Sequence, residues 1–130
     1  MKILLVDDSR ATRAMVGKGL RNYQCEVFEG ANGLECLEIA ARELPAVIVL
    51  DVTMPMLDGV ETLKRLKADP ALAAIPVVML TANCNTDEVE RVLKLGAAAY
   101  VGKVQKPTAV VEKIAELISL RPLAELAVQA

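Results

Sequence analysis

Five short apolar runs alternate with five stretches of helical pattern along the 130-residue chain. Successive parallel strands need a crossover connection, which is usually a helix, and strands covered on both faces are nearly continuous apolar runs. The alternation therefore predicts an α/β fold, a doubly wound sheet of five parallel strands with five helices on its two faces. We expect strands near residues 2–6, 25–28, 46–50, 76–80 and 98–101.

Residues that favour helix ends mark the borders of the five helices. Ser9, Asn32 and Asp58 have side chains that can cap a helix N-terminus, and Pro107 suits a first helical turn. Gly96 favours the end of the fourth helix. The expected helices cover residues 9–22, 32–43, 58–68, 85–95 and 107–119.

The size and composition of the chain fit a single domain. Hydrophobic residues make up 54% of the chain and charged residues 25%, which is ample for one core in a chain too short for two. Pro122 breaks the last helix. We therefore expect one domain over residues 1–120 and a C-terminal tail, or the start of a linker, over residues 121–130.

Charge and residue content exclude several classes of function. The formal net charge is −2 and the basic residues are dispersed among acidic ones, so we expect no direct nucleic-acid binding. Histidine is absent, which excludes histidine-based acid–base catalysis and a phosphohistidine within this chain. No apolar run reaches the roughly 20 residues of a membrane span, and the first residues begin a strand and not a leader, so we expect a cytoplasmic protein without membrane contact.

The three cysteines, Cys25, Cys36 and Cys84, are an odd number at wide spacing. This arrangement fits neither a disulfide framework nor a zinc site. We expect reduced thiols that are buried in the core.

Polar residues follow four of the five apolar runs. Asp7 and Asp8 follow the first, Asp51 the third and Thr81 the fourth, and Lys103 comes two residues after the fifth. In an open parallel sheet, ligands bind outside the carboxyl ends of the strands. Carboxylates that gather at the edge of a core need a partner, and carboxylate oxygens are ligands that Mg²⁺ prefers. The pattern predicts a site for a magnesium ion and a phosphoryl group.

Four motifs carry a family resemblance, which covers residues 1 to about 119. They are Val6-Asp7-Asp8-Ser9, Leu50-Asp51-Val52-Thr53-Met54-Pro55 followed by Asp58-Gly59, Leu80-Thr81-Ala82, and Gly96-Ala97 followed by Tyr100 and Lys103. Thr81 follows Asp51 by 30 positions and Lys103 follows Thr81 by 22. In this order and spacing the chain resembles the receiver domain of two-component response regulators, in particular the single-domain chemotaxis type. The resemblance implies a flavodoxin-like fold with strand order 2-1-3-4-5.

The resemblance also assigns the nucleophile and the metal ligands. Asp51 would accept a phosphoryl group from a phosphohistidine in a sensor histidine kinase or a histidine phosphotransfer protein. Asp8 and Asp51 would bind Mg²⁺ directly, Asp7 mainly through water, and Thr53 through its backbone carbonyl. The chain would then catalyse only its own phosphoryl transfer and autodephosphorylation, and would not be an enzyme with a separate substrate.

Further residues are assigned to phosphate binding and to output. Lys103 would pair with a phosphoryl oxygen, and Thr81 would donate its hydroxyl to another one once the phosphate is present. Tyr100 would then turn from an outward to an inward position. The surface formed by the fourth helix, the fifth strand and the fifth helix would change and engage a protein target. The sequence does not identify this target, and a phosphorylation-dependent dimer is an open alternative.

One position departs from the family pattern. Receiver domains usually have a proline directly after the lysine, with a cis peptide bond, whereas Val104 stands here. A cis bond before a residue other than proline costs roughly 3–4 kcal/mol, so we expect a trans bond. Lys106-Pro107 offers the usual dipeptide three residues later. The spacing from Tyr100 favours Lys103 as the phosphate lysine, with Lys106 as the alternative.

Two other functions are weighed against the switch. A pseudo-receiver would keep the fold and bind a partner without phosphoryl turnover, and only the missing proline favours it. A phosphatase with an aspartate nucleophile would need a second acid where Thr53 stands, and a cap domain for which the chain is too short. A regulator of this kind would act by diffusing to its target, or by passing its phosphoryl group along a relay.

Overall fold

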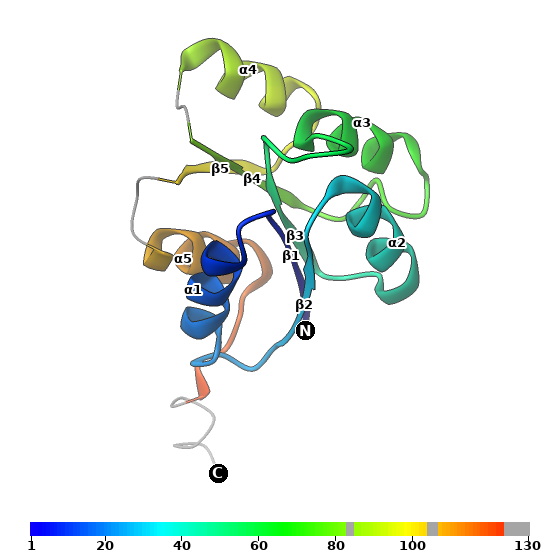
Figure 1. The fold of residues 1–130 in the computed structure, drawn as a ribbon. Coiled ribbons are helices and arrows are strands. Elements are labelled where there is room, and N and C mark those ends of the chain that lie inside the picture. The colour runs from blue at the N-terminus through cyan, green and yellow to red at the C-terminus, as the bar shows by residue number, and fades with distance from the viewer. Residues whose placement is uncertain (83–84, 104–106, 124–130) are drawn as a thin grey trace.

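A five-stranded parallel sheet forms the centre of the structure, a computed structural model that describes residues 1–82, 85–103 and 107–123 (Figure 1). The strand order is β2-β1-β3-β4-β5, as the sequence predicts. The strands are β1 (Lys2–Val6), β2 (Glu26–Gly30), β3 (Val47–Asp51), β4 (Val77–Thr81) and β5 (Ala99–Gly102).

Five helices connect the strands and cover both faces of the sheet (Figure 1). They are α1 (Arg10–Leu20), α2 (Gly33–Glu43), α3 (Gly59–Ala68), α4 (Thr86–Lys94) and α5 (Pro107–Ile118). Helices α1 and α5 lie side by side on one face, and α2, α3 and α4 lie on the other (Figure 1). This arrangement confirms the doubly wound α/β fold.

Each face of the sheet has its own hydrophobic core. In β1, Leu4 and Val6 pack with α2 and α3, whereas Ile3 and Leu5 pack with α1 and α5. Strands β3 and β4 are buried along their whole length, which explains their continuous apolar sequence. Burial on both faces fixes the register of the sheet, because a slip by one residue would exchange the two cores.

The predicted helix starts are confirmed at the capping residues. The side chains of Ser9, Asn32, Asp58 and Asn85 each accept a hydrogen bond from the backbone N–H three residues later, at 2.8 to 3.2 Å. These bonds satisfy N–H groups that have no partner within the helix. Because caps act through neighbours in the sequence, these starts are local features.

Some expected borders are off by one or two residues. Strands β2, β3, β4 and β5 each begin one residue later than expected, and pairing continues to the carboxyl edge, where Thr81 pairs with Gly102. Helix α1 ends at Leu20, because Arg21 N already bonds Lys18 O in a tighter turn. In α5, the buried face is formed by Val110, Val111 and Ile114, whereas Leu117 is exposed.

The segment after α5 returns to the beginning of β2. Gln24 N donates to Arg121 O at 3.0 Å, and Leu123 N donates to Asn22 O at 2.8 Å. Residues 121–123 are therefore attached to the domain, although the sequence places the domain border at residue 120. The remaining seven residues of the expected tail, 124–130, lie outside the described residues.

Two of the cysteines can be assessed. Both are free thiols; Cys36 is buried as expected, whereas Cys25 is only half-buried. Burial raises the pKa of the Cys36 thiol to about 12. Cys84 lies outside the described residues. Within the described ranges, no helix has both the length and the apolar character needed to cross a membrane.

Candidate functional site

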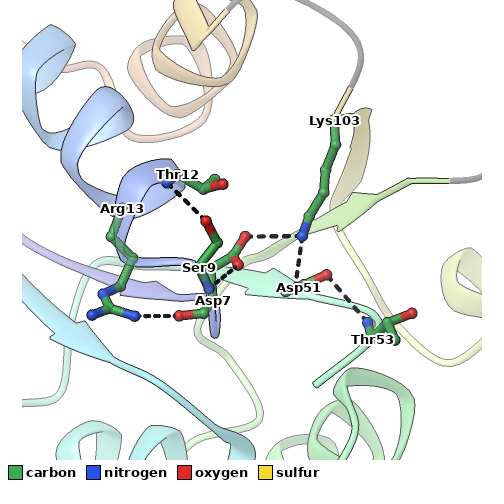
Figure 2. Close-up of polar contacts among 7 residues, drawn as sticks. All are labelled: Asp7, Ser9, Thr12, Arg13, Asp51, Thr53 and Lys103. Carbon is green, nitrogen blue, oxygen red and sulfur yellow. Dashed lines mark hydrogen bonds and ion pairs between the residues drawn. The ribbon is translucent and has the colours of Figure 1, made fainter. Parts of the chain in front are cut away.

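The predicted polar residues lie at the carboxyl edge of the sheet, where Figure 2 shows Asp7, Asp51 and Lys103 together. Asp51 is the last residue of β3 and Thr81 the last of β4, while Asp7 follows β1 and Lys103 follows β5. The parallel register aligns these strand ends, because Asp51 pairs with Leu80 and Thr81 with Gly102. Residues from four strands are brought to one place in this way.

Three carboxylates form the acidic part of the site, which we call the acidic cluster: Asp7, Asp8 and Asp51. One carboxylate oxygen from each lies within 4.8 Å of the others. Asp7 is 2% exposed and Asp51 1%, whereas Asp8 is exposed. Negative charges so close together repel one another and lose hydration, so the cluster needs positive charge nearby.

Lys103 provides positive charge from the protein itself. Its Nζ lies 2.8 Å from Asp51 Oδ2 and 3.2 Å from Asp7 Oδ2 (Figure 2). The backbone holds Lys103 in place, since Lys103 N donates to Thr81 O at 2.8 Å. Two lysines, Lys103 and Lys106, are candidates for this site. Lys103 reaches the acidic cluster. Lys106 lies outside the described residues, as does Val104.

Backbone N–H groups fix the other oxygens of the two buried acids. Thr53 N donates to Asp51 Oδ1 at 3.2 Å, and Ser9 N donates to Asp7 Oδ1 at 2.8 Å. Each buried carboxylate thus has one oxygen held by the backbone and one directed toward Lys103 (Figure 2). The carboxylates are oriented before any ligand arrives, which reduces the entropy lost on binding.

Glycine is required where α3 packs against the site. A Cβ atom added to Gly59 would lie 2.0 Å from the backbone oxygen of Asp51. The close approach lets Gly59 N donate to Val52 O at 2.9 Å. The start of α3 therefore supports the backbone of Asp51 directly.

The environment shifts the pKa of both partners of the central ion pair. Burial raises the pKa of Asp51, the hydrogen bond from Lys103 lowers it and the charge of Asp7 raises it, and together these effects leave the pKa raised to about 6. Burial alone would lower the pKa of Lys103, but its ion pairs with Asp51 and Asp7 outweigh this effect and leave the pKa raised. Lys103 is therefore a cation at neutral pH, beside an Asp51 carboxylate that is largely ionised.

The donor set fits a hard divalent cation. Oδ2 of Asp7 is buried and, among the described residues, has no hydrogen bond, although Lys103 lies nearby. A buried carboxylate oxygen without a hydrogen bond is costly unless a cation binds it. The acidic cluster offers carboxylate oxygens from three side chains, the type of ligand that Mg²⁺ prefers.

The remaining predicted residues lie around this cluster. Thr81 is buried at the end of β4, and Thr53 is exposed on the loop after β3. Tyr100 in β5 is 41% exposed, an outward position. One residue at the site was not predicted: Arg13 Nη1 donates to the backbone oxygen of Asp7. Its only sequence signal is its position one helical turn after the capping residue Ser9.

Comparison with known proteins identifies the family to which this chain belongs. The family model of the response regulator receiver domain matches residues 3–115. The chain belongs to the response regulator receiver family. Sporulation initiation phosphotransferase F of Bacillus subtilis is 34% identical over 102 residues, which are 78% of this chain and 81% of that protein. Response regulator MprA of Mycobacterium leprae is 37% identical over 92% of this chain, but the match covers 50% of that longer protein.

Solved receiver structures share the whole fold. Chemotaxis response regulator CheY4 of Vibrio cholerae superimposes with a TM-score of 0.83 at 29% identity, covering 89% of this chain and 97% of that one. The Mn²⁺-bound form of response regulator Rcp1 has a TM-score of 0.75 at 30% identity, covering 87% of this chain and 88% of that one. This receiver domain therefore has the flavodoxin-like architecture predicted from its motifs.

Proposed function

We propose that this receiver domain is a phosphorylation-dependent signalling switch, and that Asp51 accepts the phosphoryl group. The observation that carries the proposal is the buried Asp51 carboxylate, held between the other two acids of the cluster and Lys103. The donor would be a phosphohistidine of a cytoplasmic sensor histidine kinase or of a histidine phosphotransfer protein. Membership in the family and the similarity to a phosphotransferase support this assignment.

The transfer would be a single displacement at phosphorus. An Asp51 oxygen forms the new P–O bond while the P–N bond to the donor imidazole breaks, and the imidazole leaves with the electron pair. Thr53 N keeps Asp51 in place, and the ammonium of Lys103 pairs with a phosphoryl oxygen as negative charge develops. Thr81 would donate its hydroxyl to a second phosphoryl oxygen.

Divalent cation binding is part of the same proposal. Asp7, Asp8 and Asp51 would hold Mg²⁺ together with the backbone carbonyl of Thr53. When bound, Mg²⁺ supplies the positive charge that lets a carboxylate approach an anionic phosphoryl group. The Mn²⁺-bound form of Rcp1, which shares the fold at 30% identity, supports binding of a divalent cation by this chain.

The output surface would be formed by α4, β5 and α5. Helix α4 lies directly after the strand that ends in Thr81, and Val92 is its only fully buried residue among those described. A helix with so little buried apolar surface can shift at low energetic cost. Movement of Thr81 toward the phosphate, with Tyr100 turning inward, would change this surface and so the affinity for a protein target, within a diffusing regulator or a relay.

Phosphorylation by acetyl phosphate and Mg²⁺ tests the proposal. We expect intact-mass measurement to show one added phosphoryl group on the wild-type chain and none on Asp51→Asn. The matched control is Asp58→Asn, which makes the same chemical change at an exposed helix cap where asparagine caps equally well. Equal phosphorylation of wild type and Asp51→Asn would exclude Asp51 as the acceptor.

The same experiment distinguishes the pseudo-receiver, which the valine at position 104 favours. A chain that neither gains a phosphoryl group nor binds beryllofluoride, while remaining folded, would be a binding module without turnover. The presence of all three acids together with Thr81 and Lys103 argues for turnover.

A further inference from the structure

Arg13 connects α1 to the acidic cluster through the backbone of Asp7 (Figure 2). Its Nη1 donates to the carbonyl oxygen of Asp7, and its Nε lies 3.0 Å from Glu29 Oε1 in β2. The Arg13 side chain is only 15% exposed. The two contacts use two edges of one planar guanidinium group, which a lysine ammonium cannot do in the same geometry.

The contact with Arg13 completes the restraint of Asp7. Asp7 N donates to Gly30 O at 3.1 Å, as the last step of the pairing between β1 and β2. Its Oδ1 accepts from Ser9 N, and its carbonyl oxygen accepts from Arg13. The atom of Asp7 left for a ligand is Oδ2, which faces Asp51 and Lys103.

Holding this carbonyl also restrains Asp8. The peptide unit between Asp7 and Asp8 is planar, so a hydrogen bond to its oxygen sets the orientation of the whole unit. That orientation fixes ψ of Asp7 and φ of Asp8, and therefore the directions in which both carboxylates leave the backbone. Asp8 is exposed and depends on this backbone restraint more than the buried acids do.

We propose that Arg13 is a positioning residue for the acidic cluster: it orients the Asp7–Asp8 peptide so that both carboxylates face a divalent cation. Glu29 in turn orients Arg13. Because Glu29 is 52% exposed, the ion pair itself contributes little stability, and its effect is mainly geometric. The inference rests on the proposed function in one respect, namely that the cluster binds a divalent cation.

Mn²⁺ affinity tests this role, because charge and geometry predict opposite changes. Removing a positive side chain near an acidic cluster removes its Coulomb repulsion of a bound cation, and this effect alone should strengthen cation binding. If Arg13 positions the carboxylates, Arg13→Ala should instead weaken Mn²⁺ binding about ten-fold, as loss of an outer partner of metal ligands typically does. Free Mn²⁺ can be counted by electron paramagnetic resonance during a titration of the intact chain.

Two variants complete the titration. Arg10→Ala removes the same charge from an exposed position at the start of α1, and we expect it to bind Mn²⁺ as tightly as wild type or more tightly. Arg13→Lys keeps the charge and can keep one of the two contacts, so we expect an affinity between those of wild type and Arg13→Ala. An Arg13→Ala affinity equal to that of Arg10→Ala would overturn the proposal.

Amide hydrogen exchange without metal provides an independent measurement. The N–H of Ser9 bonds Asp7 Oδ1, so we expect faster exchange at Ser9 in Arg13→Ala, with unchanged protection at Leu4 and Leu5 in the core of β1. Faster exchange across the whole sheet would show a global structural role and would contradict positioning. Absence of Mn²⁺ binding by wild type would reject the metal site of the proposed function, while exchange at Ser9 would still test the role of Arg13.

Discussion

At the scale of single residues, the site combines two buried carboxylates with one lysine that contacts both. Lys103 is 25% exposed and lies within ion-pair distance of Asp7 and Asp51. Removing one partner from a buried group of charges is costly, because the remaining charges keep their desolvation penalty. Lys103 should therefore stabilise the metal-free fold in addition to any role in phosphate binding.

We predict that Lys103→Gln lowers the free energy of unfolding by about 1–3 kcal/mol at pH 8 without divalent cations. The deficit should be smaller at pH 5. Urea unfolding of wild type and variant at pH 5 and at pH 8 measures the loss of stability at each pH. Lys64→Gln, on the exposed side of α3, is the control. Equal deficits at pH 5 and pH 8 would contradict the electrostatic explanation.

The sign follows from the pKa of Asp51. Burial raises this pKa from 3.8 to about 6, so the folded state holds the proton more tightly than the unfolded state does. Stability therefore falls as the pH rises from about 4 to about 6. The hydrogen bond from Lys103 lowers the pKa of Asp51. Without this bond the pKa of Asp51 would be higher, and the fall in stability would extend toward neutral pH.

Sequence patterns predict which residues gather at the site better than they predict the contacts among them. Asp7, Asp51 and Thr81 were predictable because each ends or directly follows a strand in a sheet whose strands are parallel. The dual contact of Lys103 was not, because it depends on the path of the chain after β5. The bond from Arg13 to a carbonyl oxygen was also missed, since a backbone acceptor leaves no mark in the sequence.

At the scale of secondary-structure elements, two glycines at helical positions have opposite consequences. Gly17 lies inside α1, where an added Cβ would have no neighbour within 4 Å. Gly59 begins α3, where an added Cβ would collide with the backbone of Asp51. The same substitution therefore tests helix propensity in one element and close packing in the other.

We predict that Gly17→Ala raises the free energy of unfolding by about 0.5–1 kcal/mol, because alanine favours the helical backbone. Urea or thermal unfolding measures this change. Phosphorylation by acetyl phosphate should be unaffected. A destabilised Gly17→Ala variant would mean that this face of α1 is more closely packed than the structure shows.

For Gly59→Ala we predict a loss of about 1–3 kcal/mol, because α3 or the Asp51 backbone must move. The strain is applied directly behind Asp51, so phosphorylation by acetyl phosphate should also slow down. A time course of phosphoryl incorporation, made under conditions where the variant is folded, measures the second effect. A normal rate would show that Asp51 tolerates displacement of α3.

The elements themselves were predictable to within one or two residues, and the physical reason is local. Caps such as Asn32 and Asp58 act within a single helical turn, so the sequence contains the complete signal. The carboxyl ends of β2, β4 and β5 depend on pairing with neighbouring strands that are distant in sequence, as in the pair Thr81 and Gly102. The apolar pattern of a single run cannot include that pairing.

At the scale of the whole molecule, the segment after α5 closes the domain. Leu120 is buried, and residues 121–123 bond to the turn that precedes β2. We predict that truncation after Leu120 lowers the free energy of unfolding by about 1–2 kcal/mol through loss of these hydrogen bonds. The matched control is truncation after Leu123, which keeps both hydrogen bonds and should give the more stable of the two truncated chains. Equal stability of the two truncated chains would place the domain border at residue 120, as the sequence suggests.

Because the segment after α5 returns to the beginning of β2, it lies at the opposite end of the sheet from the acidic cluster. Residues 121–123 lie beside the amino ends of the strands, whereas the acidic cluster lies at their carboxyl ends (Figure 1). A surface tether or fused reporter attached at Leu123 would therefore lie at the end of the sheet opposite Asp51. Such an attachment would leave the approach of a donor protein sterically open.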